Sequence, residues 1–243
     1  MREFGSSDVA RTSASPSSNS VRPTRDLERE LGRQGYRTIV GVDEVGKGAW
    51  AGPLAVGVAI VPRDDGGSHA VPHDVEVLIR DSKSISEKKR ERMFDDVVAW
   101  VDDWSVGMAS PVECDRLGMS RAQRLATERA LAGLSTRPDA AMVDGSWNFV
   151  SPLVPHVTTV VKGDTTCLSI AAASILAKVT RDRLMRSVAD EHPAYRFESN
   201  KGYPCAWHRA GLYALGPSAI HRRSWAFMDA LGFWTGLERT CAG

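Results

Sequence analysis

The chain has 243 residues, hydrophobic residues make up 42% of it, and 31 Lys and Arg balance 30 Asp and Glu. This composition is typical of a soluble globular protein with one substantial core or two small ones. No apolar run approaches the roughly 18 residues that cross a bilayer, and the Ser-rich start lacks the apolar stretch of a secretory signal, so we expect a cytoplasmic protein and exclude transmembrane, secreted and fibrous classes.

Residues 1–30 are expected to form a disordered tail, followed by one folded domain over 31–243. Up to about Thr24 the apolar content is too low to offset the entropy cost of ordering the chain. At the end of the tail, a short helix over 26–33 is expected to lead into the first strand.

The first half of the domain is expected to contain a hairpin and a helix. β-branched residues predict a buried strand over 38–43, and a Gly-rich stretch separates it from a second strand over 54–61. The short connection predicts that the two strands pair antiparallel. After a polar loop over 63–74, Ser84 and Glu87 fit the S-x-x-E capping box, which predicts a helix behind them.

The second half alternates strands with helices. Ser120 is expected to cap a helix that runs to about residue 131. From Leu168, an apolar and Ala-rich run predicts a long buried helix that ends by Pro193. The further predicted elements are strands over 104–109, 140–143 and 157–161 and short helices over 207–215 and 224–231.

This order of elements indicates an α/β fold. Three antiparallel strands and then parallel additions predict a mixed five-stranded sheet flanked by helices, with a small helical C-terminal part from about residue 193. The cysteines are scattered, which excludes a zinc knuckle or a disulfide scaffold and predicts buried free thiols. They are Cys114, Cys167, Cys205 and Cys241.

Four carboxylates stand where the predicted strands end. Asp43 and Glu44 close the first strand, Asp144 closes the fourth, and Asp164 follows the fifth. Ligand sites of open α/β sheets lie outside such strand ends. Two bare carboxylates about 4 Å apart repel by roughly 4 kcal/mol at an effective dielectric near 20, so a cluster needs raised pKa values or divalent cations. Because Mg²⁺ prefers oxygen ligands, the sequence predicts a metal site here.

The first two acids raise a geometric difficulty. Neighbours in a regular strand point to opposite faces, so Asp43 and Glu44 reach one site only where the backbone is irregular. We expect a strand end or a bulge there, favoured by Gly46 and Gly48. The segment also matches the G-x-x-x-x-G-K opening of a phosphate-binding loop. That alternative is disfavoured because Gly48 replaces the Ser or Thr that holds magnesium and because the acids would repel a phosphate.

Six blocks of sequence stand in order between about residues 38 and 226. They are G-V-D-E-V-G-K-G-A-W-A-G-P-L at 41–54, D-S-K at 81–83, V-D-G at 143–145, K-G-D with S-I-A-A-A-S-I-L-A-K-V-T-R-D over 162–182, N-K-G-Y-P at 200–204, and I-H-R-R-S-W at 220–225. Together they resemble the ribonuclease HII family, and the K-G-D block with its helix is the most specific.

The resemblance implies a ribonuclease H-like fold and an endonuclease that cuts the RNA strand of RNA–DNA hybrids. It also implies cutting of duplex DNA on the 5′ side of single embedded ribonucleotides, leaving a 3′-hydroxyl and a 5′-phosphate. The metal-binding acids that it implies are Asp43, Glu44, Asp144 and Asp164. We hypothesise hydrolysis with two Mg²⁺ or Mn²⁺ ions present when substrate is bound, which requires no protein nucleophile.

The resemblance also implies substrate-binding residues. The family's Gly-Arg-Gly motif falls on Gly46, Lys47 and Gly48, and its substrate-stacking tyrosine falls on Tyr203. Because Lys47 replaces a planar guanidinium with a point charge, we expect a weaker grip on phosphate without loss of RNA specificity. The two glycines permit close backbone approach to the 2′-hydroxyl.

Charge is distributed unevenly along the chain. Residues 160–243 carry 11 basic and 7 acidic residues, whereas 64–115 carry 13 acidic and 6 basic ones, and such asymmetry suggests a face that meets a polyanion. The candidate phosphate contacts are Lys162, Lys178, Arg181, Lys201, Arg209, Arg222 and Arg223. His208 and His221 are expected to be structural, Asp182 an ion-pair or cap residue, and the tryptophans mainly core or edge residues.

Two other classes of protein remain open. A related metal-dependent DNA nuclease or transposase-like enzyme would use a similar acid cluster. A non-catalytic nucleic-acid-binding domain would account for the basic half but gives no reason for four acids near a phosphate site. We expect a monomer that binds RNA–DNA hybrids and ribonucleotide-containing duplex DNA and does not associate with membranes.

Overall fold

The structure, a computed structural model, describes residues 23–63 and 86–229. In chain order its elements are α1 (Asp26–Arg33), β1 (Ile39–Val45), β2 (Leu54–Ile60), α3 (Glu87–Trp100), β3 (Asp103–Ala109), α4 (Pro111–Leu117), α5 (Met119–Ala132), β4 (Ala140–Asp144), β5 (His156–Val160), α6 (Gly163–Thr166), α7 (Leu168–Ser187), the 3₁₀ helix η1 (Pro193–Tyr195), α8 (Phe197–Asn200), α9 (Ala206–Leu215) and α10 (Ala226–Asp229).

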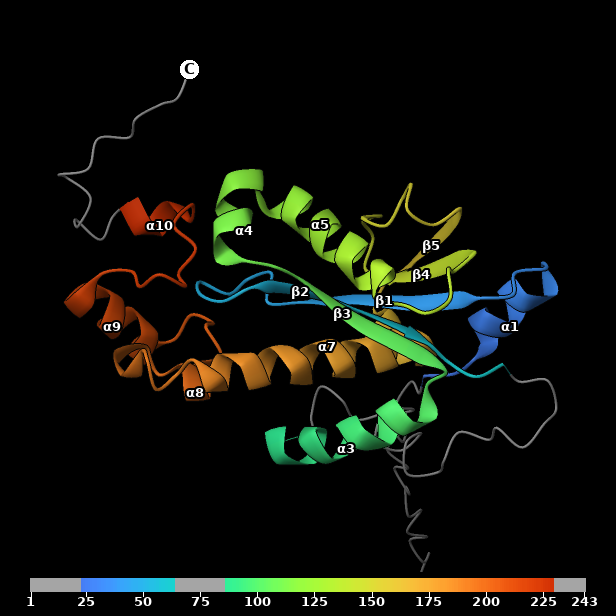
Figure 1. Cartoon of the computed structure of the whole chain (residues 1–243), viewed down its shortest axis with the longest axis horizontal. Helices are drawn as coiled ribbons and strands as arrows, with labels where there is room; N and C mark the ends of the chain where they lie inside the picture. Colours follow the sequence, from blue (N-terminus) through green and yellow to red (C-terminus); the bar gives the residue numbers. More distant parts are fainter. Residues whose placement is uncertain (1–22, 64–85, 230–243) are drawn as a thin grey trace, which may run out of the picture.

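The five strands form one mixed sheet in the order β3-β2-β1-β4-β5. β1 and β3 pair antiparallel with β2, whereas β4 pairs parallel with β1, and β5 pairs parallel with β4. Helices α4 and α5 lie on one side of the sheet and α7 and α3 on the other (Figure 1). The predicted α/β fold, with three antiparallel strands and then parallel additions, is confirmed.

The long helix α7 packs closely across β1 and β2. A Cβ at Gly41 would lie 2.1 Å from the main-chain carbon of Ser169, and one at Gly57 would lie 2.4 Å from the Ala173 carbonyl oxygen. The Ala-rich face of α7 therefore touches the strand backbone directly, which only glycine permits. This contact fixes where β1 ends relative to the helix.

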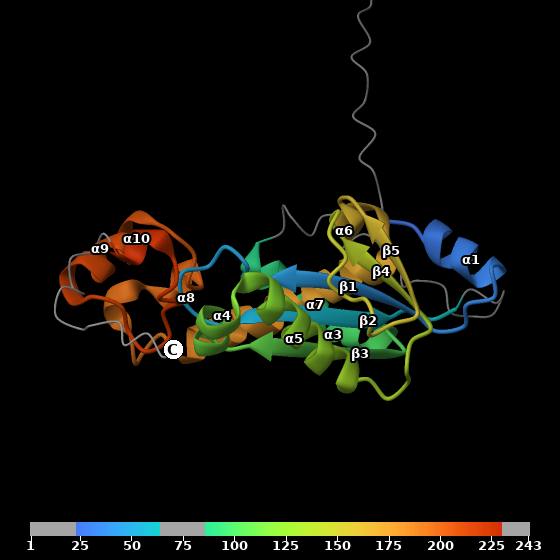
Figure 2. The same cartoon turned by 90° about the horizontal axis from the view of Figure 1, so that it is seen from above.

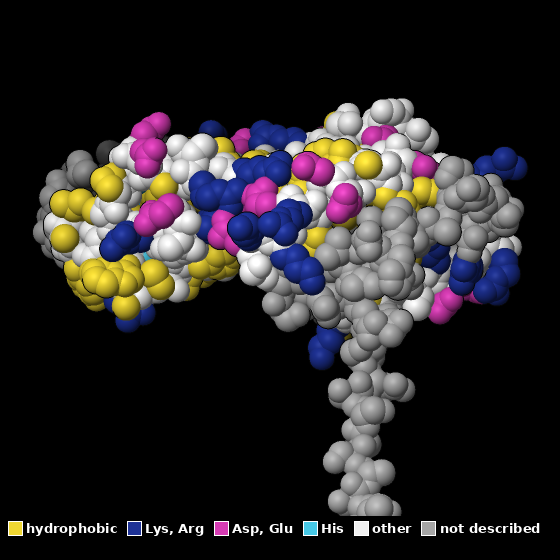
Figure 3. All heavy atoms as spheres, turned by 90° about the horizontal axis from the view of Figure 1, so that it is seen from below, with side chains coloured by type: hydrophobic (Ala, Val, Ile, Leu, Met, Phe, Trp, Pro, Cys, Tyr) yellow, Lys and Arg dark blue, Asp and Glu magenta, His cyan; other side chains and the backbone are white. Residues whose placement is uncertain are grey.

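Helix α3 covers the outer side of α7, and opposite charges join the two helices. Arg183 lies 2.7 Å from Glu91, and Arg186 pairs with both Glu87 and Glu91. Figure 3 shows Lys and Arg side chains mixed with Asp and Glu over the middle of this face. Two acids of the acidic segment and two arginines of the basic segment are thus paired with each other between adjacent helices.

The C-terminal helices form a small body at one end of the sheet (Figure 2). Met185, Tyr195, Phe197 and Leu212 are buried together there. The connection between β1 and β2 reaches into this body, where Ala51 pairs with His221. The helical C-terminal part is thereby attached to the strand end that carries the first two acids.

Several element boundaries differ from prediction. Ser86, not Ser84, caps α3, and its side chain accepts a hydrogen bond from the Lys89 amide. Helix α4 was not predicted, although Ser110 and Glu113 form a capping box around it. Helix α5 begins directly after this helix and has no side-chain cap, so the predicted capping by Ser120 was wrong. The helices η1 and α8 were also not predicted.

The folded part begins earlier than residue 31. The Thr24 amide donates to the Thr166 carbonyl (2.9 Å), and Leu31 of α1 is 2% exposed. The helix predicted over 26–33 is confirmed, but residues 24–30 belong to the packed domain and not to a tail. Residues 1–22, the loop beyond residue 63, the D-S-K block, Ser84 and Cys241 lie outside the described residues.

Three cysteines can be placed. Cys114 and Cys167 are buried free thiols, as predicted, whereas Cys205 is half-buried. Within the described ranges, the structure contains no helix whose length and apolar character would suit a membrane span.

Candidate active site

Of the two alternatives that we expected, the structure has the strand end: β1 pairs regularly through Glu44 and ends one residue later, at Val45. Asp43 pairs with Gly57, Glu44 with Val56, and the ladder continues to Val45. The chain leaves the strand at Gly46, whose φ of 84° lies in the left-handed region. Asp43 and Glu44 therefore project to opposite faces of the sheet. Their side chains can approach each other only beyond the end of the strand.

Asp144 and Asp164 are connected by the backbone between them. The Gly163 amide donates to Asp144 Oδ1 over 2.6 Å, which joins the end of β4 to the short helix α6. A Cβ at Gly163 would lie 2.5 Å from Ile170 Cδ1, so α6 packs closely against the side chain of Ile170. Asp164, 5% exposed, is carried by this helix.

The four carboxylates share one electrostatic environment. Burial raises the pKa of Asp43 to about 8, and the charges of Asp144, Glu44 and Asp164 add to this increase, whereas a hydrogen bond from Ser174 opposes it. Burial also raises the pKa of Glu44; Lys47 opposes the shift and Asp144 adds to it. Acids from three separate stretches of the chain thus lie close enough to affect one another's charge, as we predicted from their positions at the strand ends.

Divalent cations would relieve this repulsion, and the oxygen-only donor set suits Mg²⁺ or Mn²⁺. Within 23–63 and 86–229, no three Asp, Glu, His or Cys side chains stand close enough to enclose one ion. The acids are neighbours, but they do not converge on one point. Their chemistry fits divalent ions, and their side chains would have to rotate toward the ions to ligate them.

The Gly-Lys-Gly segment begins the turn that follows β1. The Gly46 amide donates to the Tyr203 hydroxyl oxygen (2.9 Å), and a Cβ at Gly46 would lie 2.2 Å from Arg181 Nε. A Cβ at Gly48 would meet open space. Since the turn leads into β2 and not into a helix, the phosphate-binding-loop alternative is excluded.

Arg181 and Arg222 are fully buried and were wrongly predicted to contact phosphate. Arg181 donates to the carbonyl oxygens of Pro53 (2.8 Å) and Ala51 (3.1 Å), and Arg222 donates to that of Gly52 (3.0 Å). The two guanidinium groups satisfy carbonyls of the connection between β1 and β2. They hold the conformation of the 46–53 loop and do not face solvent.

Two lysines that we predicted to contact phosphate form ion pairs with acidic side chains. Lys178 Nζ lies 2.8 Å from Asp182 Oδ1 and 5.4 Å from the centre of the Tyr203 ring. This confirms Asp182 as an ion-pair residue. Lys201 is 4% exposed, and its Nζ lies 3.1 Å from Glu87 Oε2, so it has no surface on which to meet a phosphate.

The remaining predicted residues divide into buried and exposed groups. His208 and His221 are buried with their Nε2 atoms 2.9 Å apart, as expected for structural residues. The exposed basic candidates are Lys162, Arg209 and Arg223.

Trp147 lies beside the candidate site, which was not predicted from the sequence. It was treated as a core or edge residue, yet it is 37% exposed, and Lys47 Nζ lies 5.3 Å from the centre of its ring. The available signal was its position three residues after Asp144.

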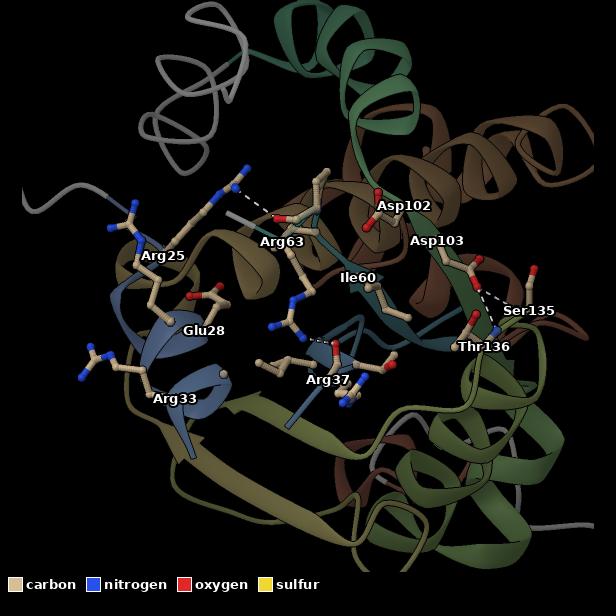
Figure 4. A pocket seen from close by; sticks show the side chains of 16 residues that line it. Arg25, Glu28, Arg33, Arg37, Ile60, Arg63, Asp102, Asp103, Ser135 and Thr136 are labelled. Carbon is tan, nitrogen blue, oxygen red and sulfur yellow. Dashed lines mark hydrogen bonds between the residues drawn. The ribbon is translucent and has the colours of Figure 1, made fainter. Parts of the chain in front are cut away.

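A cavity of about 650 Å³ lies at the opposite end of the sheet, between α1 and the chain that leaves β2 (Figure 4). Its lining includes several arginines but none of the four acids. Arg25 and Arg63 donate to the main-chain oxygens of Pro62 and Arg37, so these arginines hold the connections around α1. The cavity is therefore separate from the candidate active site.

Comparison with known proteins gives consistent matches. The profile named Ribonuclease HII matches residues 40–228. A ribonuclease HII of Streptomyces avermitilis is 43% identical over 219 residues, which cover 89% of each chain. The crystal structure of ribonuclease H2 from Pyrococcus horikoshii OT3 is similar, with a TM-score of 0.66 and 26% identity over 80% of this chain and 97% of that one. Bst-RNase HIII, solved in complex with Mn²⁺, shares the fold at 18% identity with a TM-score of 0.64, over 92% of this chain and 77% of that one.

Proposed function

The chain belongs to the ribonuclease HII family, and we propose that it cuts duplex DNA on the 5′ side of a single embedded ribonucleotide, leaving a 3′-hydroxyl and a 5′-phosphate. As a member of this family it is a ribonuclease H, an endonuclease that hydrolyses RNA in RNA–DNA hybrids. The observation that carries the proposed hydrolysis is the group of four acids at the strand ends, where burial and like charges raise the pKa of Asp43.

In this proposal, Asp43, Glu44, Asp144 and Asp164 hold two divalent ions, Mg²⁺ or Mn²⁺. When bound, such ions supply an activated water and stabilise the leaving 3′-oxygen. The protein positions the acids: the close packing of β1 against α7 fixes Asp43, and the Gly163 amide orients Asp144. In this proposal the four side chains bind the ions and do not themselves attack the phosphate.

Substrate recognition is assigned to the 46–53 loop and Tyr203. Gly48, where a side chain would meet open space, leaves the backbone accessible to a 2′-hydroxyl. Tyr203 is half-buried beside this loop and is proposed to stack on a sugar or base near the cut. Lys47 is proposed to contact a phosphate, with Lys162 and Lys178 as further contacts once Lys178 leaves Asp182.

The decisive experiment uses a labelled duplex with one ribonucleotide, incubated with the protein and Mg²⁺, and maps the ends that form. We expect a single nick on the 5′ side of the ribonucleotide, none in an all-DNA duplex, and none with EDTA. Nicking of the all-DNA duplex would indicate a DNA nuclease. Binding without any cleavage would indicate a nucleic-acid-binding domain.

Asp144→Asn tests the metal-ligand assignment. Because Asn keeps the shape and accepts the hydrogen bond from Gly163, we expect a folded variant whose cleavage rate falls at least about 10³-fold, as when a charge that stabilises the transition state is lost. Circular dichroism checks the fold, and end-labelled cleavage assays measure the rate. A folded variant that cleaves at the wild-type rate would refute the assignment.

A further inference from the structure

Trp147 is an exposed aromatic residue held in place beside the carboxylates. Its ring packs on Phe149, which is 1% exposed, with the ring centres 5.6 Å apart. Arg124 of α5 lies 5.8 Å from the Trp147 ring centre and donates to the Ser151 carbonyl oxygen over 2.7 Å. The loop after β4 is thus attached to α5 at the point where the tryptophan projects.

The Lys47 ammonium lies between a carboxylate and this ring. Its Nζ is 3.6 Å from Glu44 Oε1 and 5.3 Å from the centre of Trp147. The Lys47 carbonyl oxygen accepts a hydrogen bond from buried Arg222 over 3.2 Å, so the backbone of the residue is fixed. The side chain is 47% exposed, and its charged end remains accessible to a ligand.

We propose that Trp147 is a positioning residue that holds the Lys47 ammonium where it meets a substrate phosphate. This rests on the proposed function, in which Lys47 binds the substrate and Glu44 binds a metal ion. A cation at Glu44 would weaken the attraction of that carboxylate for Lys47. The neutral ring attracts an ammonium through its negative face whether or not a cation is bound. A lysine benefits from such a contact because its side chain is flexible and lacks the rigid planar guanidinium of arginine.

The test is a double-mutant cycle with Trp147→Leu and Lys47→Met, read in two assays. With Mg²⁺, steady-state nicking of the duplex containing one ribonucleotide gives KM and kcat. In EDTA, fluorescence anisotropy gives the affinity for the same duplex without cleavage, at several salt concentrations. Trp147→Phe serves as the matched control because it keeps an aromatic face.

We expect Trp147→Leu to raise KM about two- to fivefold, the size of an exposed cation–π contact, with kcat nearly unchanged. In EDTA, where Glu44 still holds the lysine, the loss of affinity should be nearer twofold. Lys47→Met should weaken binding and lower the slope of log affinity against log salt by about 0.9. The double variant should match Lys47→Met, and Trp147→Phe should retain most of the wild-type affinity, because phenylalanine keeps an aromatic face that attracts a cation less strongly.

Two results would overturn this inference. If Trp147→Leu lowers the affinity for the duplex equally in the wild type and in the Lys47→Met variant, the ring contacts the substrate by itself. Unchanged KM and affinity in Trp147→Leu would show that the ring has no role. The proposed function fails separately, if the wild type binds the duplex in EDTA but does not nick it with Mg²⁺. Matching thermal unfolding midpoints check that the variants fold.

Discussion

The buried carboxyl of Asp43 lowers the stability of the folded protein when it is ionised. Its side chain is 8% exposed, and its pKa is raised from 3.8 to about 8 by burial and by three neighbouring acids. Between pH 3.8 and about pH 8, the Asp43 carboxyl is therefore protonated in the folded protein but ionised in the unfolded chain. Stability contributed by this group is present below about pH 4 and is lost as pH rises toward 8.

Asp43→Asn removes this penalty and tests it. Without metal, we expect the variant to be more stable than the wild type by roughly 5 kcal/mol at pH 8 and by less than about 2 kcal/mol at pH 5. Urea unfolding in EDTA at both pH values measures this. Addition of Mg²⁺ should stabilise the wild type more than the variant. A variant that is less stable at pH 8 than at pH 5, relative to the wild type, would contradict the burial of a charged carboxyl.

At this scale the predicted grouping of the four acids is confirmed, their role as metal ligands stays a prediction, and two of the predicted basic contacts were wrong. Carboxylates at strand ends could be predicted because strand order determines where they gather. Whether an arginine faces solvent depends on tertiary packing that no local pattern contains, so Arg181 and Arg222 were misassigned although both are fully buried. Trp147 was missed for the same reason.

At the scale of elements, glycine determines how tightly layers pack. Gly57→Ala would place a Cβ 2.4 Å from the Ala173 carbonyl oxygen of α7, a backbone atom that cannot move alone. We expect a loss of about 3 kcal/mol or more, as for severe overpacking. Gly32→Ala is the control, because Gly32 lies in α1 with nothing within 4 Å of an added Cβ, and alanine there should stabilise by about 0.5–1 kcal/mol.

Chemical denaturation of both variants measures these changes in the free energy of unfolding. Equal stabilities of the Gly57→Ala and Gly32→Ala variants would show that α7 does not touch the strand backbone. The position of Asp43 relative to Ser174 would then need another explanation.

The strands and long helices were predictable because their periodicity is local and strong. The α4–α5 corner was not, since one continuous helical pattern is interrupted only at Gly118, whose φ is 74°. Near Asp43 and Glu44 we expected a strand end or a bulge, and the structure has the strand end, because β1 stops at Val45. The strand is regular up to this point, and the acids lie near one another where the strand ends.

For the whole molecule, the C-terminal part supports the 46–53 loop of the candidate active site. Arg222 donates to the carbonyl oxygens of Gly52 and Lys47, and the Arg222 amide donates to the Trp50 carbonyl oxygen over 2.8 Å. The loop that carries Lys47 is thus held by a residue about 175 positions later in the chain. Charge patterns in the sequence could not show this, because the neighbouring Arg223 has the same side chain and is exposed.

The pair of adjacent arginines provides the last test. Arg222→Met removes a buried guanidinium and leaves loop carbonyls without a donor, so we expect a loss of about 3 kcal/mol or more in unfolding free energy. Arg222→Lys should retain part of this stability and reduce kcat/KM for the duplex containing one ribonucleotide about tenfold through Lys47, a barrier increase of about 1.4 kcal/mol. Arg223→Met should change stability by less than about 1 kcal/mol, because an interaction of an exposed charge contributes little. Urea unfolding and nicking kinetics distinguish the variants, and equal stability of Arg222→Met and Arg223→Met would mean that the C-terminal part does not hold the loop.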